Sequence, residues 1–271
     1  MGRIEEALRK AKADRGGNGL RSEMDGSRKR GDQLAPGVKG PQDVRIAEIP
    51  ASHIVSADNE QLREQRVIAA SDQDVRVEPY RQLRTQLLKT MRDNHWTTLA
   101  ITSPNEGAGK TLTAANLAIG LARDVSTTVM LVDLDLKTPS IHKILNLSPD
   151  KGLVDYLEDH AELEDILFDP GLRQLTVLAG RSAGKNSSEL LATPKMQELV
   201  RDLCHQNEAN ITIFDLPPLL RNDDAILFAP YADATLVVVE DGVTTEEQLQ
   251  QSLRLLDKAN VIGTILNKAR C

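Results

Sequence analysis

The sequence predicts an α/β fold in which helices cover both faces of a mostly parallel, twisted sheet, with a flexible extension at the N-terminus. Short apolar segments alternate with segments of helical periodicity from residue 75 onward, which is typical of strands joined by helices in a parallel sheet. The expected strands are apolar almost throughout, as in Thr235-Leu-Val-Val-Val239, and this indicates burial on both sheet faces. A chain of 271 residues, of which 40% are apolar, can bury one sizeable core of this kind.

The expected elements follow one another along the chain from residue 78 onward. Strands are expected near residues 97–103, 127–133, 174–179, 210–215, 234–240 and 261–266. Helices are expected over residues 78–91, 111–123, 187–204 and 245–259. Within the helix over 111–123, apolar residues recur at helical spacing, for example Leu112, Ala115 and Ala118. The compact domain is therefore expected to cover residues 75–271.

The segment before that domain divides into two parts. Residues 1–15 are expected to form a short amphipathic helix, which needs a partner surface because so short a helix is marginal in isolation. Its apolar stripe comprises Ile4, Ala7, Leu8 and Ala11. Residues 16–74 are rich in Gly, Ser, Pro, Asp and Arg without periodicity, which predicts a flexible linker. Residues 1–45 are basic, with 11 Lys and Arg against 7 acids. Docking of the helix on a partner or on anionic lipid and a solvated tail remain alternatives.

The overall composition excludes several classes of function. A net charge of −7 argues against general nucleic-acid binding, and 3% aromatic residues leave no stacking platform for single strands. No apolar segment approaches the length of a membrane span, and the start lacks a signal-peptide core, so a cytoplasmic protein is expected. Glu6 stands where a myristoylation signal needs Ser or Thr. Cys204 and Cys271 are expected to be reduced thiols without a role.

The most informative segment is the loop after the strand near 97–103. It ends in Gly109-Lys110-Thr111, and a helix follows directly. Backbone N–H groups of such a loop and of the helix N-terminus bind phosphate oxygens, while Lys110 reaches the outer phosphates and Thr111 ligates a metal ion. The expected nucleotide-binding residues are Glu106, Gly107, Ala108, Gly109, Lys110, Thr111 and Leu112. Pro104 replaces the first glycine of the usual pattern, so a glycine turn with a solvated lysine is the structural alternative.

Acidic residues stand at the ends of two expected strands. Asp133 closes the strand near 127–133 with Asp135 just beyond it, and Asp215 closes the strand over 210–215. Ligands of open parallel sheets bind at the carboxyl ends of strands. We therefore expect Thr111, Asp133 and Asp215 to hold Mg²⁺, and Asp135 to orient or deprotonate an attacking hydroxyl group. Capping of the following helices is the alternative, and for Asp135 both interpretations stay open.

These motifs, in this order, resemble the kinase domain of bacterial tyrosine kinases of the exopolysaccharide-biosynthesis autokinase type, a P-loop class related to the partition ATPases. The resemblance covers about residues 75–270, and the start Met1 to Lys10 also resembles such autokinases. The motifs that carry it are Glu78-Pro-Tyr-Arg81-Gln-Leu-Arg84, the loop from Thr102 to Thr111, Leu131-Val-Asp-Leu-Asp-Leu-Lys-Thr-Pro139, Ser188-Glu-Leu-Leu191, Asp215-Leu-Pro-Pro218 and Ile265-Leu-Asn-Lys268.

The resemblance implies transfer of phosphate from ATP to tyrosine with Mg²⁺, in the regulation of exopolysaccharide or capsule synthesis and export. It implies catalytic roles for Lys110, Asp133 and Asp135. Asn267 is expected to contact the adenine, with a cap or turn residue as the alternative. Glu78, Arg81 and Arg84 share one helix face and are expected to contact a neighbouring subunit of a homo-oligomer. The implied partner is a membrane polysaccharide co-polymerase or chain-length protein, which would hold the chain at the inner face of the membrane.

Some positions depart from the family pattern. Lys137 stands where the family often has arginine, and the tyrosines Tyr80, Tyr156 and Tyr231 form no C-terminal cluster. These departures favour an alternative function, an ATP-driven oligomerisation switch of the export machinery without phosphotransfer. Asn105 stands where partition ATPases carry a signature lysine, which together with the acidic charge argues against a partition function on DNA.

Overall fold

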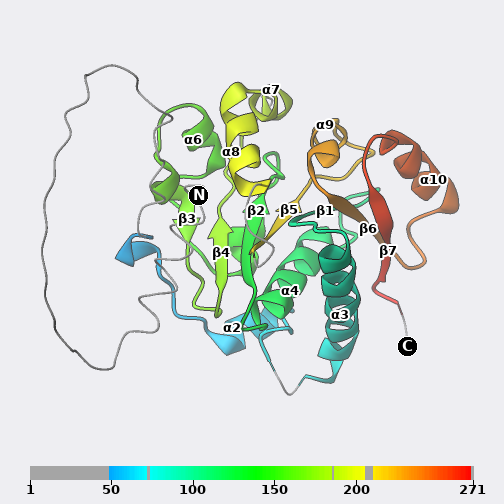
Figure 1. Cartoon of the computed structure of the whole chain (residues 1–271), viewed down its shortest axis with the longest axis horizontal. Coiled ribbons are helices and arrows are strands. Elements are labelled where there is room, and N and C mark those ends of the chain that lie inside the picture. The colour runs from blue at the N-terminus through cyan, green and yellow to red at the C-terminus, as the bar shows by residue number, and fades with distance from the viewer. Residues whose placement is uncertain (1–48, 72–73, 185, 205–209, 270–271) are drawn as a thin grey trace, which may run out of the picture.

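The computed structural model describes residues 49–71, 74–184, 186–204 and 210–269, so the helix expected over residues 1–15 lies outside the described residues. Within them the chain forms one seven-stranded sheet in the order β3-β4-β2-β5-β1-β6-β7 (Figure 1). All neighbouring strands are parallel except β3 and β4. The strands are β1 Thr98–Thr102, β2 Thr128–Asp133, β3 Leu167–Phe168, β4 Leu175–Leu178, β5 Asn210–Asp215, β6 Ala234–Glu240 and β7 Val261–Asn267. The predicted α/β class is confirmed.

Helices cover both faces of this sheet. The α-helices are α2 Asn59–Glu64, α3 Glu78–Asp93, α4 Lys110–Ala122, α5 Ile141–Ile144, α6 Leu153–Leu157, α7 Ser187–Leu191, α8 Pro194–Cys204, α9 Asp224–Phe228 and α10 Glu246–Leu255. Short 3₁₀ turns are η1 Ala51–His53, η2 Val75–Val77, η3 Leu163–Ile166 and η4 Ala229–Tyr231. One apolar core lies beneath α2 to α5, and a second lies beneath α6 to α10.

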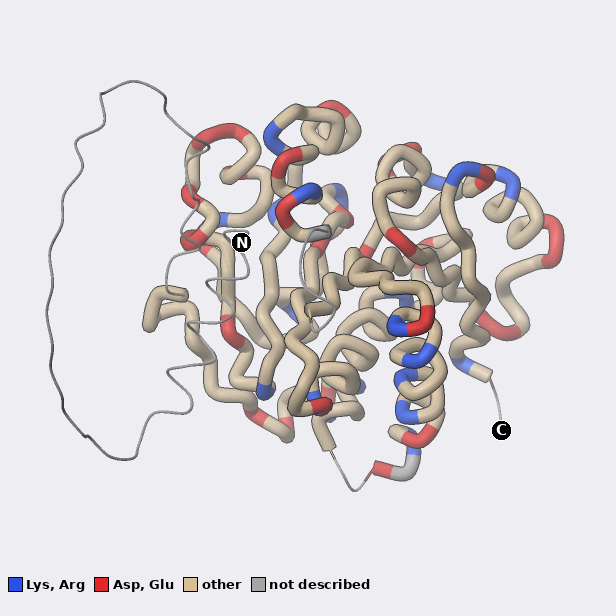
Figure 2. Tube along the Cα trace, viewed as in Figure 1, with Lys and Arg blue, Asp and Glu red and all other residues tan. Residues whose placement is uncertain are grey.

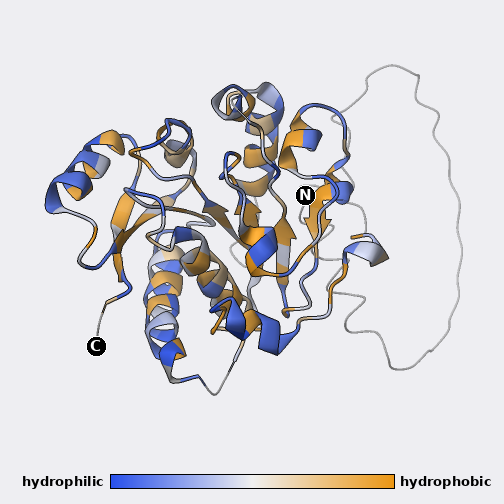
Figure 3. Cartoon of the chain, turned by 180° about the vertical axis from the view of Figure 1, so that it is seen from behind, coloured by the Kyte–Doolittle hydropathy of each residue, from blue (hydrophilic) through white to orange (hydrophobic). Residues whose placement is uncertain are grey.

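Side chains of the central strands alternate between these two cores. Leu99 and Ile101 of β1 join the core beneath α4, whereas Ala100 between them joins the opposite core. Such alternation follows from the two-residue repeat of a strand, and it explains why the strands are apolar on both sides. Figure 3 shows the strands as mostly hydrophobic, with hydrophilic stretches on the outer helices.

The structure corrects the expected helix over residues 187–204. It is two helices, α7 and α8, which are separated at Ala192 and Thr193. Pro194 explains the break, because proline lacks an N–H group and disfavours helical geometry in the residue before it. The helix expected over 245–259 begins at Glu246 with Thr245 as its N-cap and ends earlier, at Leu255. The short antiparallel strand β3 was not expected.

The structure also corrects the expected boundary between linker and domain. Residues 49–71, assigned to the flexible linker, fold against the domain and include α2. Leu62 and Val67 are buried in the core beneath α4. Asn116 of α4 accepts a hydrogen bond from the Ala69 backbone N–H at 2.9 Å and donates one to the Arg66 carbonyl at 3.2 Å. The packed part of the chain therefore begins before residue 75.

The strand order brings distant chain segments together at one edge of the sheet. β5 lies between β2 and β1, with Asp133 opposite Asp215 and Ile101 opposite Asp215 in the two registers. The loop after β1 and the acidic ends of β2 and β5 are therefore neighbours at the carboxyl edge. No helix among the described residues is long and apolar enough to span a membrane.

Candidate nucleotide site

The loop between β1 and α4 has the backbone geometry of a phosphate cradle. Gly107 and Gly109 have φ angles of +80° and +91°, which side-chain-bearing residues rarely adopt. A Cβ atom at Gly109 would also meet the Asn267 side-chain amide, which would have to move to make room for it. Helix α4 begins at Lys110, immediately after the loop, so its N-terminal N–H groups adjoin the loop and could bind phosphate oxygens there.

Lys110 lies in the centre of the site. Its ammonium group is 2.8 Å from Asp135 Oδ2 and 3.6 Å from Asp215 Oδ1, and it donates a hydrogen bond to the Thr111 hydroxyl at 3.1 Å. The Lys110 residue is 8% exposed, so it is not the solvated lysine of the structural alternative. Burial alone lowers the pKa of Lys110, but the carboxylates of Asp215 and Asp135 outweigh it, and the net shift is upward.

Asp133 and Asp215 are both fully buried. Burial raises the pKa of Asp133 to about 7, with a further upward contribution from the negative charge of Asp215. Asp133 Oδ2 accepts backbone hydrogen bonds from Ser140 at 2.9 Å and Ile141 at 3.0 Å, at the start of α5. Burial also raises the pKa of Asp215, and Lys110 opposes this shift. Asp133 therefore lies in the site and also caps the start of α5, which is the alternative role that the sequence left open.

Asp135 contacts two elements at once. Its Oδ2 meets Lys110, and its Oδ1 accepts hydrogen bonds from the Thr138 backbone N–H and hydroxyl group, each at 3.0 Å. The carboxylate is therefore held in one orientation, with its side chain 3% exposed. Lys110 and Thr138 thus hold the Asp135 carboxylate from two sides.

The donor set fits a magnesium ion that also uses phosphate oxygens. Among the described residues, neither oxygen of Asp215 has a hydrogen-bond partner, which is unusual for so buried a carboxylate. The hydroxyl oxygens of Thr111 and Ser140 lie 3.4 Å apart, and the Ser140 backbone N–H donates to Asp133. No group of three His, Cys, Asp or Glu side chains in the described part of the chain could hold a metal alone. Phosphate oxygens and water would complete the oxygen coordination that Mg²⁺ prefers.

The remaining predicted cofactor residues contribute in different ways. Ala108 is buried and its carbonyl accepts a hydrogen bond from Asn267 at 2.8 Å. The Asn267 side-chain oxygen accepts a second bond from the Lys268 backbone N–H. Both ends of this amide are engaged with the backbone, which favours the cap or turn alternative over adenine contact. Glu106 forms an ion pair with Arg221, and Leu112 is partly exposed on α4.

The structure adds residues that the sequence did not indicate. Gly180, after β4, approaches Asp133 so closely that a Cβ atom would lie 2.9 Å from its carboxyl carbon. Lys137 donates to the Asn222 side chain at 2.9 Å and so joins the segment after Asp135 to the loop after Asp215. A glycine after an apolar strand was the visible signal for Gly180. Asn222 had no signal, because its position depends on the strand order.

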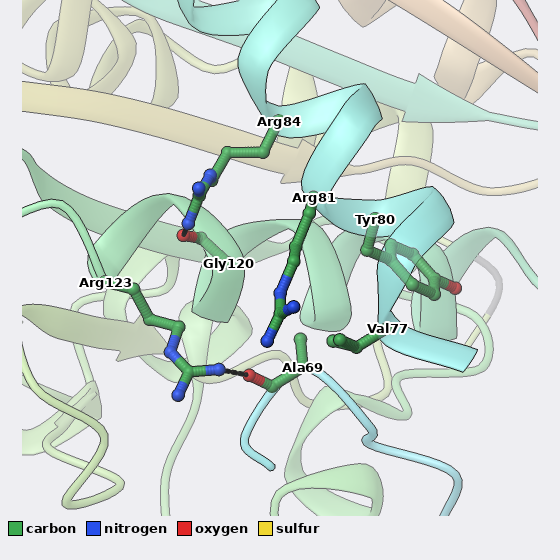
Figure 4. Close-up of a pocket in the computed structure, with 7 residues that line it drawn as sticks. All are labelled: Ala69, Val77, Tyr80, Arg81, Arg84, Gly120 and Arg123. Atoms are coloured by element: carbon green, nitrogen blue, oxygen red, sulfur yellow. Dashed lines mark hydrogen bonds between the residues drawn. The ribbon is translucent and has the colours of Figure 1, made fainter. Parts of the chain in front are cut away.

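The predicted oligomer-contact residues lie elsewhere, on α3. Arg84 donates to the carbonyl of Gly120, in the last turn of α4, at 3.3 Å. Arg81 lies 3.5 Å from Glu78, and both side chains are exposed by about half. Figure 4 shows Arg81 and Arg84 beside a pocket of about 90 Å³, which is lined by Ala69, Val77, Tyr80, Arg81, Arg84, Gly120 and Arg123. In Figure 2, Lys and Arg recur along α3, whereas Asp and Glu gather around α6.

The three tyrosines are differently exposed. Tyr80 is half-buried, and burial raises its pKa. Tyr156 is also half-buried, with the Lys195 ammonium 4.2 Å from its ring centroid. Tyr231 is 52% exposed.

Comparisons with known proteins agree with this geometry. Residues 99–270 match the family described as the CobQ/CobB/MinD/ParA nucleotide binding domain. The chain is 32% identical over 207 residues to the tyrosine-protein kinase YwqD of Bacillus subtilis strain 168, covering 75% of this chain and 86% of that one. It is 29% identical over 240 residues to the putative tyrosine-protein kinase EpsB of Ralstonia nicotianae, but spans only 32% of that protein.

A solved structure extends the agreement to the fold. The kinase domain of the Escherichia coli tyrosine kinase Etk superposes with a TM-score of 0.69 at 27% identity, covering 81% of this chain and 89% of that one. The fold described above is thus shared with that kinase domain. The chain belongs to the CobQ/CobB/MinD/ParA nucleotide-binding family, among the bacterial tyrosine kinases.

Proposed function

We propose that this chain transfers the γ-phosphoryl group of ATP to a tyrosine hydroxyl group and thereby regulates exopolysaccharide or capsule synthesis and export. The observation that carries the proposal is the position of Lys110. Its ammonium group lies at the end of the glycine loop, in contact with Asp135 at 2.8 Å and within 3.6 Å of Asp215. The kinase relatives support the choice of tyrosine as acceptor.

The glycine loop binds the nucleotide in this proposal. Backbone N–H groups of residues 107–109 bind the phosphates, and Lys110 neutralises charge that develops on the transferred group. Thr111, Asp133 and Asp215 hold Mg²⁺, which neutralises phosphate charge when it is bound. Entry of nucleotide draws Lys110 from the carboxylates toward the phosphates, because one ammonium group faces several competing anions.

Asp135 accepts the proton of the attacking hydroxyl group. The tyrosine oxygen forms a bond to the γ-phosphorus while the bond from that phosphorus to the bridging oxygen breaks, which leaves ADP and phosphotyrosine. The proton of the hydroxyl group goes to Asp135, whose carboxylate Thr138 holds in place.

The acceptor lies in a second molecule. Tyr231 is the most exposed tyrosine of this chain, so we propose it as the acceptor when one copy phosphorylates another. A separate protein is the other acceptor class.

Assembly and partner binding complete the proposal. Glu78 and Arg81 expose charged groups on α3 and provide a contact with a neighbouring copy. A membrane polysaccharide co-polymerase or chain-length protein activates the kinase and holds it at the inner face of the membrane. These assignments rest on the motifs shared with the kinase family.

Labelling with γ-³²P ATP and Mg²⁺ tests the phosphotransfer. We expect phosphotyrosine in the wild-type protein, especially with the partner's cytoplasmic segment present, and none in Lys110→Ala. The matched control is Lys151→Ala, because Lys151 pairs with Asp165 at the same distance of 2.8 Å but on the surface. Tyrosine label that persists in Lys110→Ala would exclude the proposed function, and loss of label in Tyr231→Phe would identify the acceptor.

An ATP-driven oligomerisation switch is the second candidate function. The half-buried positions of Tyr80 and Tyr156 favour it, because they leave few accessible acceptors within the chain. Under this function, ATP changes the oligomer mass in light scattering while phosphotyrosine stays undetectable. An oligomer mass that ATP leaves unchanged would exclude the switch.

A further inference from the structure

The loop after β5 is attached to the start of the phosphate loop. The Leu219 backbone N–H donates to the Ser103 carbonyl at 2.9 Å, and the Leu220 N–H donates to the Pro104 carbonyl at 3.1 Å. Arg221 follows directly, so its backbone is placed at the rim of the phosphate loop independently of its side chain.

The Arg221 side chain turns toward that loop. Its Nη1 lies 3.2 Å from Glu106 Oε1, and Glu106 directly precedes Gly107. The two side chains are 65% and 52% exposed, respectively. An ion pair so exposed contributes little to stability, so stability alone gives no reason for its position. The Arg221 guanidinium group thus lies beside the residue that precedes Gly107, in a loop that binds phosphates in the proposed function.

The site carries more negative than positive charge, so a further cation such as Arg221 would stabilise a bound nucleotide. Asp133, Asp135 and Asp215 surround the ammonium group of Lys110, and the outer phosphates of a nucleotide add further negative charge. Phosphoryl transfer is accelerated by a guanidinium group that contacts the transferred phosphate, since its planar fork matches two phosphate oxygens.

We infer that Arg221 binds the outer phosphate of ATP, and that Glu106 holds its guanidinium group aside until that phosphate enters. This inference rests on the proposed function for its catalytic part. During transfer, Arg221 donates hydrogen bonds to oxygens of the γ-phosphoryl group while the bond to the tyrosine oxygen forms and the bond to ADP breaks. Glu106 loses its partner at the same moment and faces water.

Opposite substitutions of the pair test the inference. ATP and ADP affinities are measured by calorimetry on the full chain with Mg²⁺, and tyrosine labelling is measured in parallel. Because the γ-phosphate is the ligand, Arg221→Ala is expected to weaken ATP binding about tenfold and ADP binding less than threefold, and to slow labelling about 10²-fold. The ATP affinity and the labelling rate of Arg221→Lys are expected to lie between those of the wild type and of Arg221→Ala, because lysine keeps the positive charge but lacks the two-pronged guanidinium group. Glu106→Gln releases the guanidinium group, so ATP binding is expected to tighten.

The selectivity for ATP over ADP decides the result. If Arg221 acts only through its positive charge, Arg221→Ala weakens ATP and ADP binding by similar factors and Arg221→Lys restores both affinities, and the inference is wrong. An unchanged ATP affinity in Arg221→Ala also overturns it. Arg92→Ala is the matched control, because Arg92 pairs with Asp124 at the same 3.2 Å on the surface near the other end of α4. A wild-type protein that binds ATP without labelling tyrosine contradicts the proposed function, while the affinities still decide the role of Arg221.

Discussion

The two ends of helix α4 carry opposite charge arrangements. At its start, Lys110 is surrounded by the buried carboxylates of Asp135 and Asp215. Toward its end, Arg84 donates to the Gly120 carbonyl, and the C-cap residue Arg123 donates to the Ala69 carbonyl at 2.8 Å. At the start of α4, carboxylates surround one ammonium group, whereas at its end guanidinium groups donate to backbone carbonyl oxygens.

This difference shows which end is arranged for a ligand. Guanidinium groups at the carbonyl end complement the helix dipole and satisfy backbone acceptors, so that end is stabilised by the chain itself. Acids near the N–H end are compensated only in part by Lys110, and Asp215 keeps oxygens without a hydrogen-bond partner among the described residues. A bound cation would offset the excess of negative charge in such an arrangement. We therefore propose that the start of α4 is the functional end.

The largest expected effect is that of Asp135→Asn. The amide keeps the shape and the contacts with Thr138 but accepts no proton, so tyrosine labelling is expected to fall by about 10³-fold. ADP affinity is expected to rise rather than fall, because Asp135 no longer competes with the phosphates for Lys110. Single-turnover labelling measures the rate. The control is Asp165→Asn, which removes an equally short but exposed ion pair, and an unchanged rate in Asp135→Asn would contradict the role as base.

The next largest effect is a loss of stability on substitution of Asn116, in the middle of α4. Asn116 is fully buried and links α4 to residues 66–69 by its hydrogen bonds. Because Asn116→Ala leaves the Ala69 N–H buried without a partner, the free energy of unfolding is expected to fall by about 3 kcal/mol. Urea unfolding followed by Trp96 fluorescence measures it. Asn94→Ala, at the exposed end of α3, serves as the comparison and is expected to cost less than about 1 kcal/mol.

Metal removal tests the incomplete charge balance at the start of α4. With EDTA in place of Mg²⁺, the phosphates of ATP face Asp133 and Asp215 directly, and ATP affinity is expected to fall about tenfold. Calorimetric titrations with and without the metal measure this ratio. In Asp215→Asn the ratio is expected to shrink, because one of the repelling charges is gone. An equal ratio in both proteins would show that Asp215 does not hold the metal.

The smallest expected effect distinguishes the two arginines of α3. Arg84→Ala removes a donor from the last turn of α4 and is expected to lower the free energy of unfolding by about 1 kcal/mol. Arg81→Ala, one turn earlier, is expected to change stability by less than about 0.5 kcal/mol but to shift the monomer–oligomer equilibrium. Thermal melting and light scattering separate these outcomes. Equal losses of stability in Arg84→Ala and Arg81→Ala would contradict the assignment of Arg84 as a capping residue and of Arg81 as a contact residue.

Several features of the fold and site could be predicted because they depend on local chemistry. Glycines at the loop, a lysine at the helix start and aspartates at strand ends each have a physical reason visible in the sequence. The break before α8 was missed, although Pro194 lies inside the expected helix and is the local signal for it. Packing of residues 49–71 was not visible, because it depends on Asn116 finding backbone partners across the fold. The antiparallel strand β3 has only two residues and so too short a pattern to predict.

The sequence by itself determined the elements of this protein: the apolar strands, the glycine loop and the acids that follow the strands. The sequence predicted that Asp133 and Asp215 share one site, but only the tertiary structure decided the strand order that places β5 beside β2 with these two residues in register, because strand order depends on how all the elements pack together. The same holds for Arg221 and Glu106, whose side chains meet across segments far apart in the chain. Each residue type determines its own side-chain chemistry, whereas the proximity of residues far apart in the chain depends on how the whole sheet packs.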